Sequence, residues 1–454
     1  MRRYEHAAPC RDSRREYLLY RKVRTILDRQ VDAGVAYGAA LSYHIWTTIH
    51  AEWGALRTIL FLCSGLLRLL AFSPKLRWLR RTPSKSPRVI LVHGEFLRSD
   101  LEETFRKIQA LSDDADVLDL RGWEASASPA GLHYLLTQLL PTALTLPAEL
   151  RLDQRLYLSC LLGQHVKFAA TLPRAISFKR YRLALAFSDA LPWPNVLMQV
   201  AKAQGCRTAA LQHGQIIVYD ESDPHINMIN YESFVSDAFL IWGEFTRREL
   251  CKRIPAERLF IMGHPRYLDF DHAAVKAARA ARPPSGVFGI AFEQEIYKGS
   301  NRRMLSIAEK VAEVLDLRYV VKMHPLNVRA DYPEAEVLHR CVGMGSLDLA
   351  MDDFASRIDF CVARTSTVYN EMLVRAVPVF RYKDAGYYSM ADHPDEFEDA
   401  RGLLGLWNKA RAAPQKEAAA LSELAQFFFF GLGGESQKRY RTLLKTGEFP
   451  PAKT

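Results

Sequence analysis

Four short polar motifs follow apolar runs of the kind that form buried strands. They are His93-Gly94-Glu95, Gln212-His213-Gly214, His324-Pro325 and Thr365-Ser366-Thr367. In open parallel sheets, ligands bind beyond the carboxyl ends of the strands. Histidine, carboxylate and hydroxyl groups at such ends can bind an anion or move a proton. These motifs are therefore the first candidates for a functional site.

The motif at residues 365–367 precedes a segment, residues 368–373, that is predicted to be helical. Hydroxyl side chains are favoured at helix starts, where free backbone amides attract anions. Thr365, Ser366 and Thr367 therefore predict a diphosphate or phosphodiester site, with an ordinary helix cap as the alternative. Glu371 lies on the same helix, where its carboxylate can accept hydrogen bonds from a ribose or simply offset the helix dipole.

A second part of the predicted anion site is His324-Pro325, which ends a predicted strand that contains Lys322. Proline fixes the direction of the chain. A histidine ring can hydrogen-bond a phosphate oxygen and assist a leaving group. We expect Lys322, His324 and Pro325 to act together with residues 365–367 on the donor phosphate.

The candidate groups for proton transfer lie in the first half of the chain. Gly214 allows a tight turn that presents His213, and histidine titrates close to neutral pH, so His213 can act as a general base. The alternative is a structural histidine bonded to the backbone. Asp189, after a neighbouring predicted strand, can orient the ring or act as the base itself, and Glu95 is a further candidate base. The residues expected on the acceptor side are His93, Gly94, Gln212 and Gly214.

Short apolar strands alternate with longer helical segments in two separate stretches. The first stretch begins after a Pro- and Ser-containing linker at residues 82–87, and the second begins at residue 287 after a basic, Ala-rich and Pro-rich segment. This alternation is typical of parallel sheets built from βαβ units. We predict an α/β protein with two doubly wound Rossmann-like domains that face a cleft, and an N-terminal helical extension.

The predicted domain bounds follow from these breaks. They are 1–86 for the helical extension, 87–270 for the first Rossmann-like domain, 285–410 for the second, and 411–454 for helices that pack back across the domains. Residues before 83 carry few strand signals, so this part is expected to be helical.

Basic residues are concentrated near the N-terminus. Residues 1–88 hold 17 of the 61 Lys and Arg residues but only 6 of the 51 Asp and Glu residues, so the rest of the chain is close to neutral. A nucleic-acid partner is therefore not expected. The apolar run Ile59–Phe72 is too short to span a bilayer, but cations and Trp78 flank it. We interpret residues 1–81 either as a contact with an anionic membrane surface or as helices packed on the first domain.

The chain lacks the GxGxxG dinucleotide fingerprint and the Walker loop, and its 7 cysteines are scattered singly. We therefore expect no cofactor beyond a nucleotide-sugar substrate and no metal ion. Scattered cysteines are typical of reduced thiols in a cytoplasmic protein.

Together these motifs resemble bacterial GT-B enzymes of surface-polysaccharide assembly. The nearest groups in pattern are capsule and lipopolysaccharide transferases that use CMP-activated acidic sugars, and the CDP-glycerol glycerophosphotransferases of teichoic acid synthesis. The resemblance covers roughly residues 180–385. It is carried by residues 201–214, Trp242-Gly243, residues 263–266, residues 322–325 and residues 365–371.

In those families a His-Pro pair and a Ser/Thr pair contact the donor phosphate and nucleotide. The resemblance implies that role for His324, Pro325, Ser366 and Thr367. This chain has Ser-Thr where the families have Ser-Ser, which leaves the choice of nucleotide open.

The resemblance implies a metal-independent glycosyltransferase that moves a sugar from a nucleotide-activated donor to a lipid-linked or growing surface glycan. A CMP-linked acidic sugar is the favoured donor. The alternatives are a sugar-nucleotide epimerase or hydrolase of the same fold, and a non-catalytic protein that binds glycan or nucleotide. The expected location is the cytoplasm, peripheral to the inner face of the cytoplasmic membrane.

Overall fold

The structure is a computed structural model of the whole chain. It describes all residues except 1–12, 31–33, 52–53, 82–87, 95–98, 113, 127–128, 219–225, 326, 337, 347–348, 385–386, 388–392, 433 and 451–454. The candidate base Glu95 and the predicted linker at residues 82–87 therefore lie outside the described residues.

The N-terminal domain is built on a seven-stranded sheet in the order β1-β3-β2-β4-β5-β6-β7. The strands are β1 (Phe72–Arg80), β2 (Arg88–His93), β3 (Asp116–Ala125), β4 (Tyr181–Ala186), β5 (Arg207–Leu211), β6 (Ala238–Ile241) and β7 (Leu259–Ile261). All neighbours are parallel except β1, which is antiparallel to β3. The strand order reverses at β2 and β4, so their carboxyl ends form the switch point where ligands bind in such sheets.

The C-terminal domain is built on a six-stranded parallel sheet in the order β10-β9-β8-β11-β12-β13. The strands are β8 (Val287–Ala291), β9 (Arg318–Lys322), β10 (Cys341–Gly345), β11 (Cys361–Ala363), β12 (Val379–Tyr382) and β13 (Glu396–Phe397). Their continuous apolar runs are typical of strands buried on both faces. Here the switch point lies between β8 and β11.

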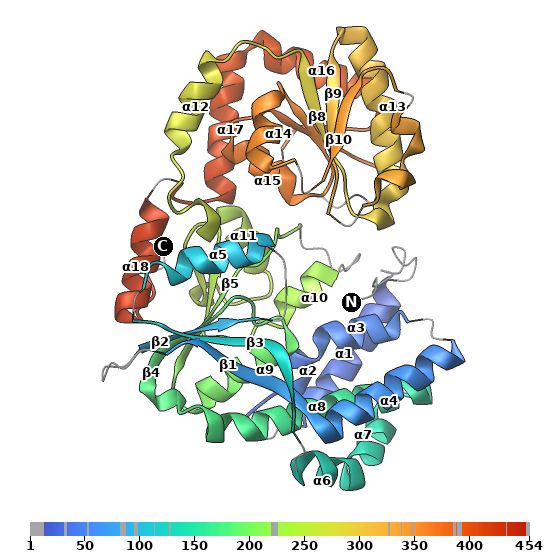
Figure 1. Cartoon of the computed structure of the whole chain (residues 1–454), viewed down its shortest axis with the longest axis vertical. Coiled ribbons are helices and arrows are strands. Elements are labelled where there is room, and N and C mark those ends of the chain that lie inside the picture. The colour runs from blue at the N-terminus through green and yellow to red at the C-terminus, as the bar shows by residue number, and fades with distance from the viewer. Residues whose placement is uncertain are drawn as a thin grey trace.

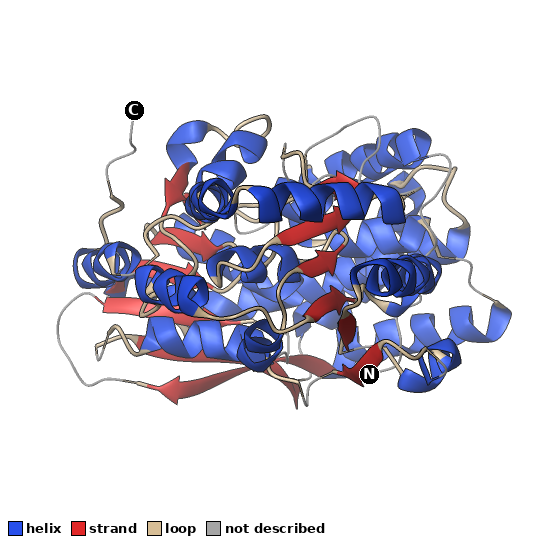
Figure 2. Ribbon diagram, turned by 90° about the horizontal axis from the view of Figure 1, so that it is seen from above, coloured by secondary structure: helices blue, strands red, loops and turns tan. Residues whose placement is uncertain are grey.

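Helices cover the sheets, so that the strands lie between helical layers (Figure 2). The N-terminal domain contains α5 (Ser99–Gln109), α6 (Pro129–Thr137), α7 (Leu139–Thr145), α8 (Leu152–Ala175), α9 (Pro192–Ala203), α10 (Ile226–Glu232) and α11 (Glu244–Leu250). The C-terminal domain contains α13 (Lys298–Leu315), α14 (Met351–Arg357), α15 (Thr367–Val374) and α16 (Ala400–Ala412).

The chain crosses between the domains twice. It leaves the N-terminal domain through α12 (His272–Ala281) and returns through α17 (Pro414–Phe428), which packs on both α15 and α11. The last helix, α18 (Glu435–Thr446), lies against the N-terminal domain (Figure 1). Tyr440, Leu443 and Leu444 of α18 are buried in the same core as strand β2. The prediction of an α/β protein with two doubly wound Rossmann-like domains, the GT-B architecture, is therefore confirmed.

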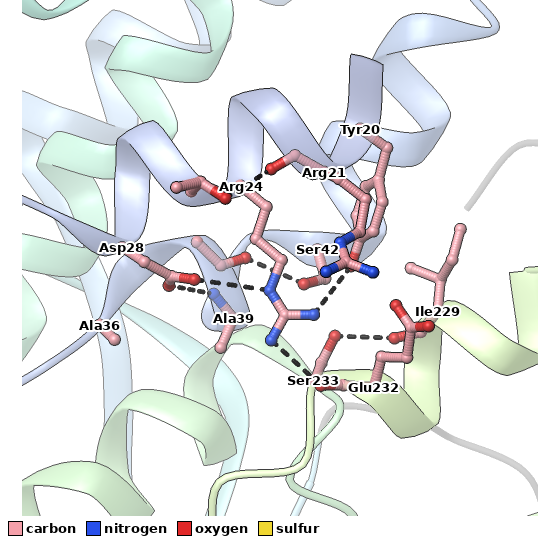
Figure 3. A network of polar contacts seen from close by, with 12 residues as sticks. Tyr20, Arg21, Arg24, Asp28, Ala36, Ala39, Ser42, Ile229, Glu232 and Ser233 are labelled. Atoms are coloured by element: carbon pink, nitrogen blue, oxygen red, sulfur yellow. Dashed lines mark hydrogen bonds and ion pairs between the residues drawn. The ribbon is translucent and has the colours of Figure 1, made fainter. Parts of the chain in front are cut away.

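The N-terminal extension forms part of the core of the first domain. It contains α1 (Ser13–Asp28), α2 (Tyr37–Ala40), α3 (Ser42–Ile49) and α4 (Ala55–Ala71). Tyr20, Val23 and Leu27 of α1 are fully buried in one cluster with residues of β2 and β4. The Arg24 guanidinium donates to the Glu232 carbonyl oxygen of α10 at 3.0 Å, which ties α1 to that helix (Figure 3).

The prediction that this part of the chain has only helices was wrong for residues 72–80. They form β1, the antiparallel edge strand. Lys75, Arg77 and Leu79 are exposed, whereas Leu76 and Trp78 between them pack against the core. This alternation with a period of two marks a half-buried strand. The preceding apolar run and the Ser73-Pro74 pair obscured that pattern.

Candidate functional site

The loop after β8 places a buried carboxyl group at the switch point of the C-terminal sheet. Glu293 follows β8 by two residues and is 6% exposed. The Asn301 side chain accepts from the Glu293 amide at 3.0 Å and donates to its carbonyl oxygen at 3.1 Å. The Asn327 side chain donates to the same oxygen at 2.8 Å. The loops after β8 and β9 and the first turn of α13 are therefore held together.

The environment of Glu293 favours its protonated form. Burial raises the pKa of its carboxyl to about 8, against the opposing effects of the Arg364 charge and a hydrogen bond from the Thr365 amide. Within the described chain, its Oε1 atom has no hydrogen-bond partner. At neutral pH this carboxylic acid can donate a hydrogen bond to an anion. A buried group with an unsatisfied polar atom at a switch point is a candidate ligand contact.

Arg364 places a buried cation at the end of β11, where it lowers the pKa of the Glu293 carboxyl. Its side chain is 1% exposed and its Nε donates to Asp384 at 2.9 Å. Ser300 and Arg303 donate to the same carboxylate, and the guanidinium lies 4.6 Å from the centre of the Tyr297 ring. These contacts fix the guanidinium immediately before the Ser/Thr motif.

The start of α15 carries the predicted Ser/Thr motif. Ser366 has extended backbone dihedrals, and its hydroxyl accepts from the Val368 amide at 3.3 Å. Ser366 therefore caps the helix, which was the alternative interpretation of this motif from the sequence. The Tyr369 amide bonds to the Ser366 carbonyl oxygen, but the Thr367 amide has no hydrogen-bond partner within the described chain. That amide and the Thr367 hydroxyl can still bind an anion at this helix start.

His324-Pro325 lies in a turn beside the Glu293 loop. The Asn327 amide donates to the His324 carbonyl oxygen at 2.9 Å, with Pro325 at the second position of the turn, where its fixed φ is favoured. The Asn327 side chain then connects this turn to Glu293. The Lys322 ammonium group donates to the Ser346 carbonyl oxygen after β10, so this lysine contacts the next loop along the sheet.

On the N-terminal domain, the Gln212-His213-Gly214 turn is held from two sides. The Gln212 side chain accepts from the Trp242 amide at 2.9 Å and donates to the Gly214 carbonyl oxygen at 2.8 Å. The Tyr231 hydroxyl donates to the same oxygen at 2.9 Å. The half-buried His213 ring stacks on the Tyr231 ring, with 5.4 Å between centroids. Gln212 and Gly214 thus frame the turn that presents His213.

The N-terminal extension supports this turn indirectly. Tyr231 belongs to α10, and the next residue, Glu232, is bonded through its carbonyl oxygen to Arg24 and through its carboxylate to the Tyr17 hydroxyl. Both contacts come from α1. The helix that carries the ring beneath His213 is therefore anchored by a segment more than 200 residues earlier in the chain.

Three contacts join this face of the N-terminal domain to α15. The Asn370 side-chain amide donates to the side-chain oxygen of Gln215, two residues after His213. Arg266 pairs with Glu371 at 3.1 Å, and the His272 ring is 2.8 Å from the Val374 carbonyl oxygen. The structure therefore brings the His213 turn and the helix that follows the Ser/Thr motif to the same interdomain junction.

Glu371 contributes to that junction through ion pairs. Its carboxylate is 3.1 Å from Arg266 and 3.7 Å from Arg375, and its side chain is mostly buried. The carboxylate is thus shared between two arginines, one from each domain. Its predicted role toward a ribose stays a prediction.

Asp189 and His93 lie at the ends of β4 and β2, the switch point of the N-terminal sheet. Asp189 accepts from the amides of Val235 and Ser236 at 3.0 and 2.8 Å, and from the Ser236 hydroxyl at 2.7 Å. These bonds fix the segment that leads into β6. The Asp189 carboxylate makes no hydrogen bond to His213. The His93 ring packs on Phe105, 4.6 Å between centroids, and burial lowers its pKa. Gly94 lies close to the start of α9. A Cβ at this position would lie 3.0 Å from the side chain of Leu191, the residue that precedes α9.

Four residues of this arrangement were missed from the sequence. Glu293 directly follows the predicted strand at residues 287–292, and Arg364 directly precedes the Ser/Thr motif. The strand-end rule applied to the other motifs could have found both. Asn301 and Asn327 carry no local signal, because their role depends on the Glu293 backbone.

Among the described residues, no group of three or more His, Cys, Asp or Glu side chains is placed to hold a metal ion. No helix in the described ranges combines the length and the apolar character needed to cross a bilayer.

The chain matches no protein-family model, and no curated protein matches its sequence. Its fold is similar to several solved structures at low identity. The UDP-GlcNAc 2-epimerase from Neisseria meningitidis bound to UDP-GlcNAc has a TM-score of 0.49 and 12% identity, covering 79% of this chain and 100% of that one. A glycosyltransferase from Rickettsia africae has a TM-score of 0.45 and 10% identity, covering 79% and 99%. The wall teichoic acid polymerase TagF has the same score and identity, covering 80% and 89%.

Proposed function

We propose that this chain is a GT-B glycosyltransferase that transfers a sugar from a nucleotide-activated donor to a glycan. One observation carries the proposal. Glu293, His324 and Thr367 follow the neighbouring strands β8, β9 and β11 at the switch point of the C-terminal sheet, and burial raises the pKa of the Glu293 carboxyl to about 8. The His213 turn of the other domain is joined to α15, which begins at Thr367, through Gln215 and Asn370.

The donor phosphate binds at the start of α15 in this proposal. Thr367 and the Ser366 cap supply neutral donors, Arg364 supplies nearby positive charge, and the acid form of Glu293 donates a hydrogen bond. Preorganised donors of this kind stabilise the charge that develops on the departing nucleotide. His324 and Pro325 shape the neighbouring wall, and the His324 ring assists the leaving phosphate.

The acceptor hydroxyl lies on the N-terminal domain, where the His213 ring takes its proton. The Tyr231 stack and the bonds to Gly214 orient this ring. Closure of the two domains aligns the hydroxyl with the anomeric carbon and excludes water. Asp189 acts in this proposal as a support for the fold, because all three hydrogen bonds of its carboxylate go to Val235 and Ser236.

The resemblance of the His-Pro and Ser-Thr motifs favours a CMP-linked acidic sugar as donor. It also favours a lipid-linked or growing surface glycan as acceptor, inside the cell. The Asn327 amide and the Ser366 hydroxyl hold the backbones of these two motifs.

Nucleotide binding tests this proposal first. Thermal unfolding would be followed with CMP, CDP, UDP, GDP and ADP, and a nucleotide at about 100 times its Kd should add about 2.7 kcal/mol of stability. Ser366→Ala should lose the response to the nucleotide that binds. Asp399→Ala is the matched control, because Asp399 caps α16 by accepting from Gly402 at 2.8 Å in the same domain.

Each cap deletion should cost about 1 kcal/mol of stability, so only the loss of ligand response separates the two variants. A full response in Ser366→Ala, or no response of the wild type to any nucleotide, would contradict a donor site at α15. Transfer is then separated from epimerisation and hydrolysis by product mass with and without a glycan acceptor. Donor turnover that needs no acceptor would favour the epimerase or hydrolase.

A further inference from the structure

A row of exposed leucines runs along α6 and α7. Leu132, Leu136, Leu140 and Leu144 follow one another at intervals of four residues and are 51% to 74% exposed. The neighbouring helix α4 adds Leu56, Leu60 and Leu67, which are 56% to 73% exposed. We call these seven residues the leucine face. Exposed apolar side chains on helices that pack on one another, as α4 does on α6 and α6 on α7, are a feature of interaction sites on globular proteins.

The helices that carry the leucine face are tightly packed on one another. A Cβ on Gly131 of α6 would lie 2.4 Å from the Leu69 carbonyl oxygen of α4, so these two backbones touch. A Cβ on Gly163 of α8 would lie 2.5 Å from the Tyr134 ring, so α6 also sits directly on α8. The leucine face is therefore a fixed surface of the first domain.

A buried lysine closes the base of this surface. The Lys167 ammonium group of α8 donates to the carbonyl oxygens of Leu69, Phe72 and Ser126. These three oxygens lie at the end of α4, the start of β1 and the end of β3. Lys167 therefore fixes the end of α4 against the neighbouring ends of β1 and β3.

The leucine face lies at the end of the molecule farthest from the C-terminal domain. Figure 1 shows α6 and α7 at the lower end of the long axis, with α4 beside them. The faces of the two domains that meet at α15 lie away from this end. A partner on the leucine face would thus leave the interdomain junction accessible.

The elements that carry or border the leucine face, α4, β1, α6 and α7, contain basic residues and no acidic ones, and the nearby Asp153 of α8, which contacts Thr58, is paired with Arg151. Residues 55–81 contain six Lys or Arg residues and no Asp or Glu, and residues 129–145 contain no Lys, Arg, Asp or Glu. Arg57, Arg68, Lys75 and Arg77 are exposed. Arg68 lies 4.9 Å from the centre of the Trp123 ring, which is itself 41% exposed at the edge of the surface. Exposed leucines, an amphipathic aromatic ring and a rim of cations are the features of a surface that inserts into the headgroup region of an anionic bilayer.

We infer that the leucine face binds the surface of a lipid bilayer that contains anionic phospholipids. The leucines enter the boundary between headgroups and acyl chains, and the rim cations pair with lipid phosphates. The sequence alone pointed to residues 1–81. In the structure one face of α1 and all of α2 are buried in the core of the first domain, and in this proposal the membrane contact consists of α4 with α6 and α7.

Flotation of the full chain with lipid vesicles tests this inference. The vesicles would contain phosphatidylcholine alone or with about 30% phosphatidylglycerol. The variant Leu132→Gln/Leu136→Gln/Leu144→Gln removes leucines from the face. The variant Val314→Gln/Val342→Gln removes exposed apolar side chains of similar exposure, 68% and 49%, from the other domain. Circular dichroism and thermal unfolding would establish that both variants fold.

We expect the wild type to float with the anionic vesicles, more weakly at high salt, and the valine variant to do the same. The leucine variant should lose binding by about tenfold or more. Equal flotation of wild type and leucine variant, or no flotation of the wild type, would overturn the inference. A leucine-dependent dimer in sedimentation velocity without vesicle binding would overturn it in favour of self-association. Vesicle binding needs no nucleotide. The flotation experiment can therefore contradict the membrane inference without contradicting the proposed nucleotide site, and the reverse also holds.

Discussion

The strand ends of the two domains carry similar polar residues but hold them in different ways. In the N-terminal domain, Asp189 and Gln212 direct their side chains to backbone groups of neighbouring segments. In the C-terminal domain, the neighbours of Glu293 hold its backbone, and one oxygen of its carboxyl group has no partner within the described chain. In the first domain the strand-end side chains stabilise the backbone, including the turn that carries His213. In the second domain the buried carboxyl group of Glu293 can still bind a ligand.

This difference distinguishes residues that support the fold, such as Asp189, from residues that can bind a ligand, such as Glu293. The strand-end rule finds candidates in both domains, but it does not say which polar atoms already have partners. Most buried polar atoms are hydrogen-bonded. Glu293 Oε1 is one of several described side-chain atoms without such a partner, and its place two residues after β8 makes it a candidate ligand contact.

The largest expected effect is on His213. His213→Asn removes the proposed base, so the rate of transfer should fall by about 10²- to 10⁴-fold while nucleotide binding stays at the wild-type level. Steady-state kinetics and titration of the nucleotide measure the two quantities. Tyr231→Phe is the control, because it keeps the ring stack and loses only the hydrogen bond to Gly214. A His213→Asn enzyme with wild-type turnover would remove His213 from the mechanism.

The next effect is on stability at Asp189. Asp189→Ala leaves two backbone amides and one hydroxyl without their buried acceptor, and should lower the free energy of unfolding by about 3 kcal/mol. The midpoint of urea unfolding followed by fluorescence measures it. Asp237→Ala should cost less, because Asp237 also bonds a backbone amide and a hydroxyl, those of Thr208, but is only half-buried.

The proposed donor site predicts that nucleotide binding survives in the folded fraction of Asp189→Ala. If this variant unfolds at the wild-type midpoint but has no activity, Asp189 takes part in the reaction. Asp189 would then not be only a support for the fold, and the difference drawn between the two domains would be wrong.

The smallest effect is a change in the pH dependence of nucleotide binding. The raised pKa of Glu293, about 8, means that the carboxyl donates a hydrogen bond below that pH and becomes an anion above it. An anion repels phosphate, so Kd for the bound nucleotide should rise about tenfold between about pH 7 and pH 9. Isothermal titration calorimetry measures this, and phosphate groups, with a second pKa of about 6, stay ionised throughout.

Glu293→Gln keeps a hydrogen-bond donor at the same place but cannot ionise, so its Kd should be constant over that range. Glu295→Gln, two residues along the same loop and less buried, should keep the wild-type profile. Identical profiles for Glu293→Gln and the wild type would mean that Glu293 does not touch the nucleotide.

Much of the site could be predicted because its signals are local. Apolar runs, the residues that end them and the Pro and Ser/Thr positions are all visible over a few residues, and they located the His324, His213 and Ser366 motifs at strand ends. The edge strand β1 was missed because its alternation follows directly on an apolar helix. The partners of Asp189 and Glu371 could not be predicted, because they lie 46, 47 and 105 residues away.

The sequence by itself determined the two-domain α/β architecture and the short motifs at the ends of its strands, since both depend on periodicity within single elements. Only the tertiary structure decided which motif residues have partners, why the Glu293 carboxyl stays protonated, and which leucines of α4, α6 and α7 remain exposed. Hydrogen-bond satisfaction, pKa and exposure are properties of the surroundings, and for these residues the surroundings are assembled from distant parts of the chain.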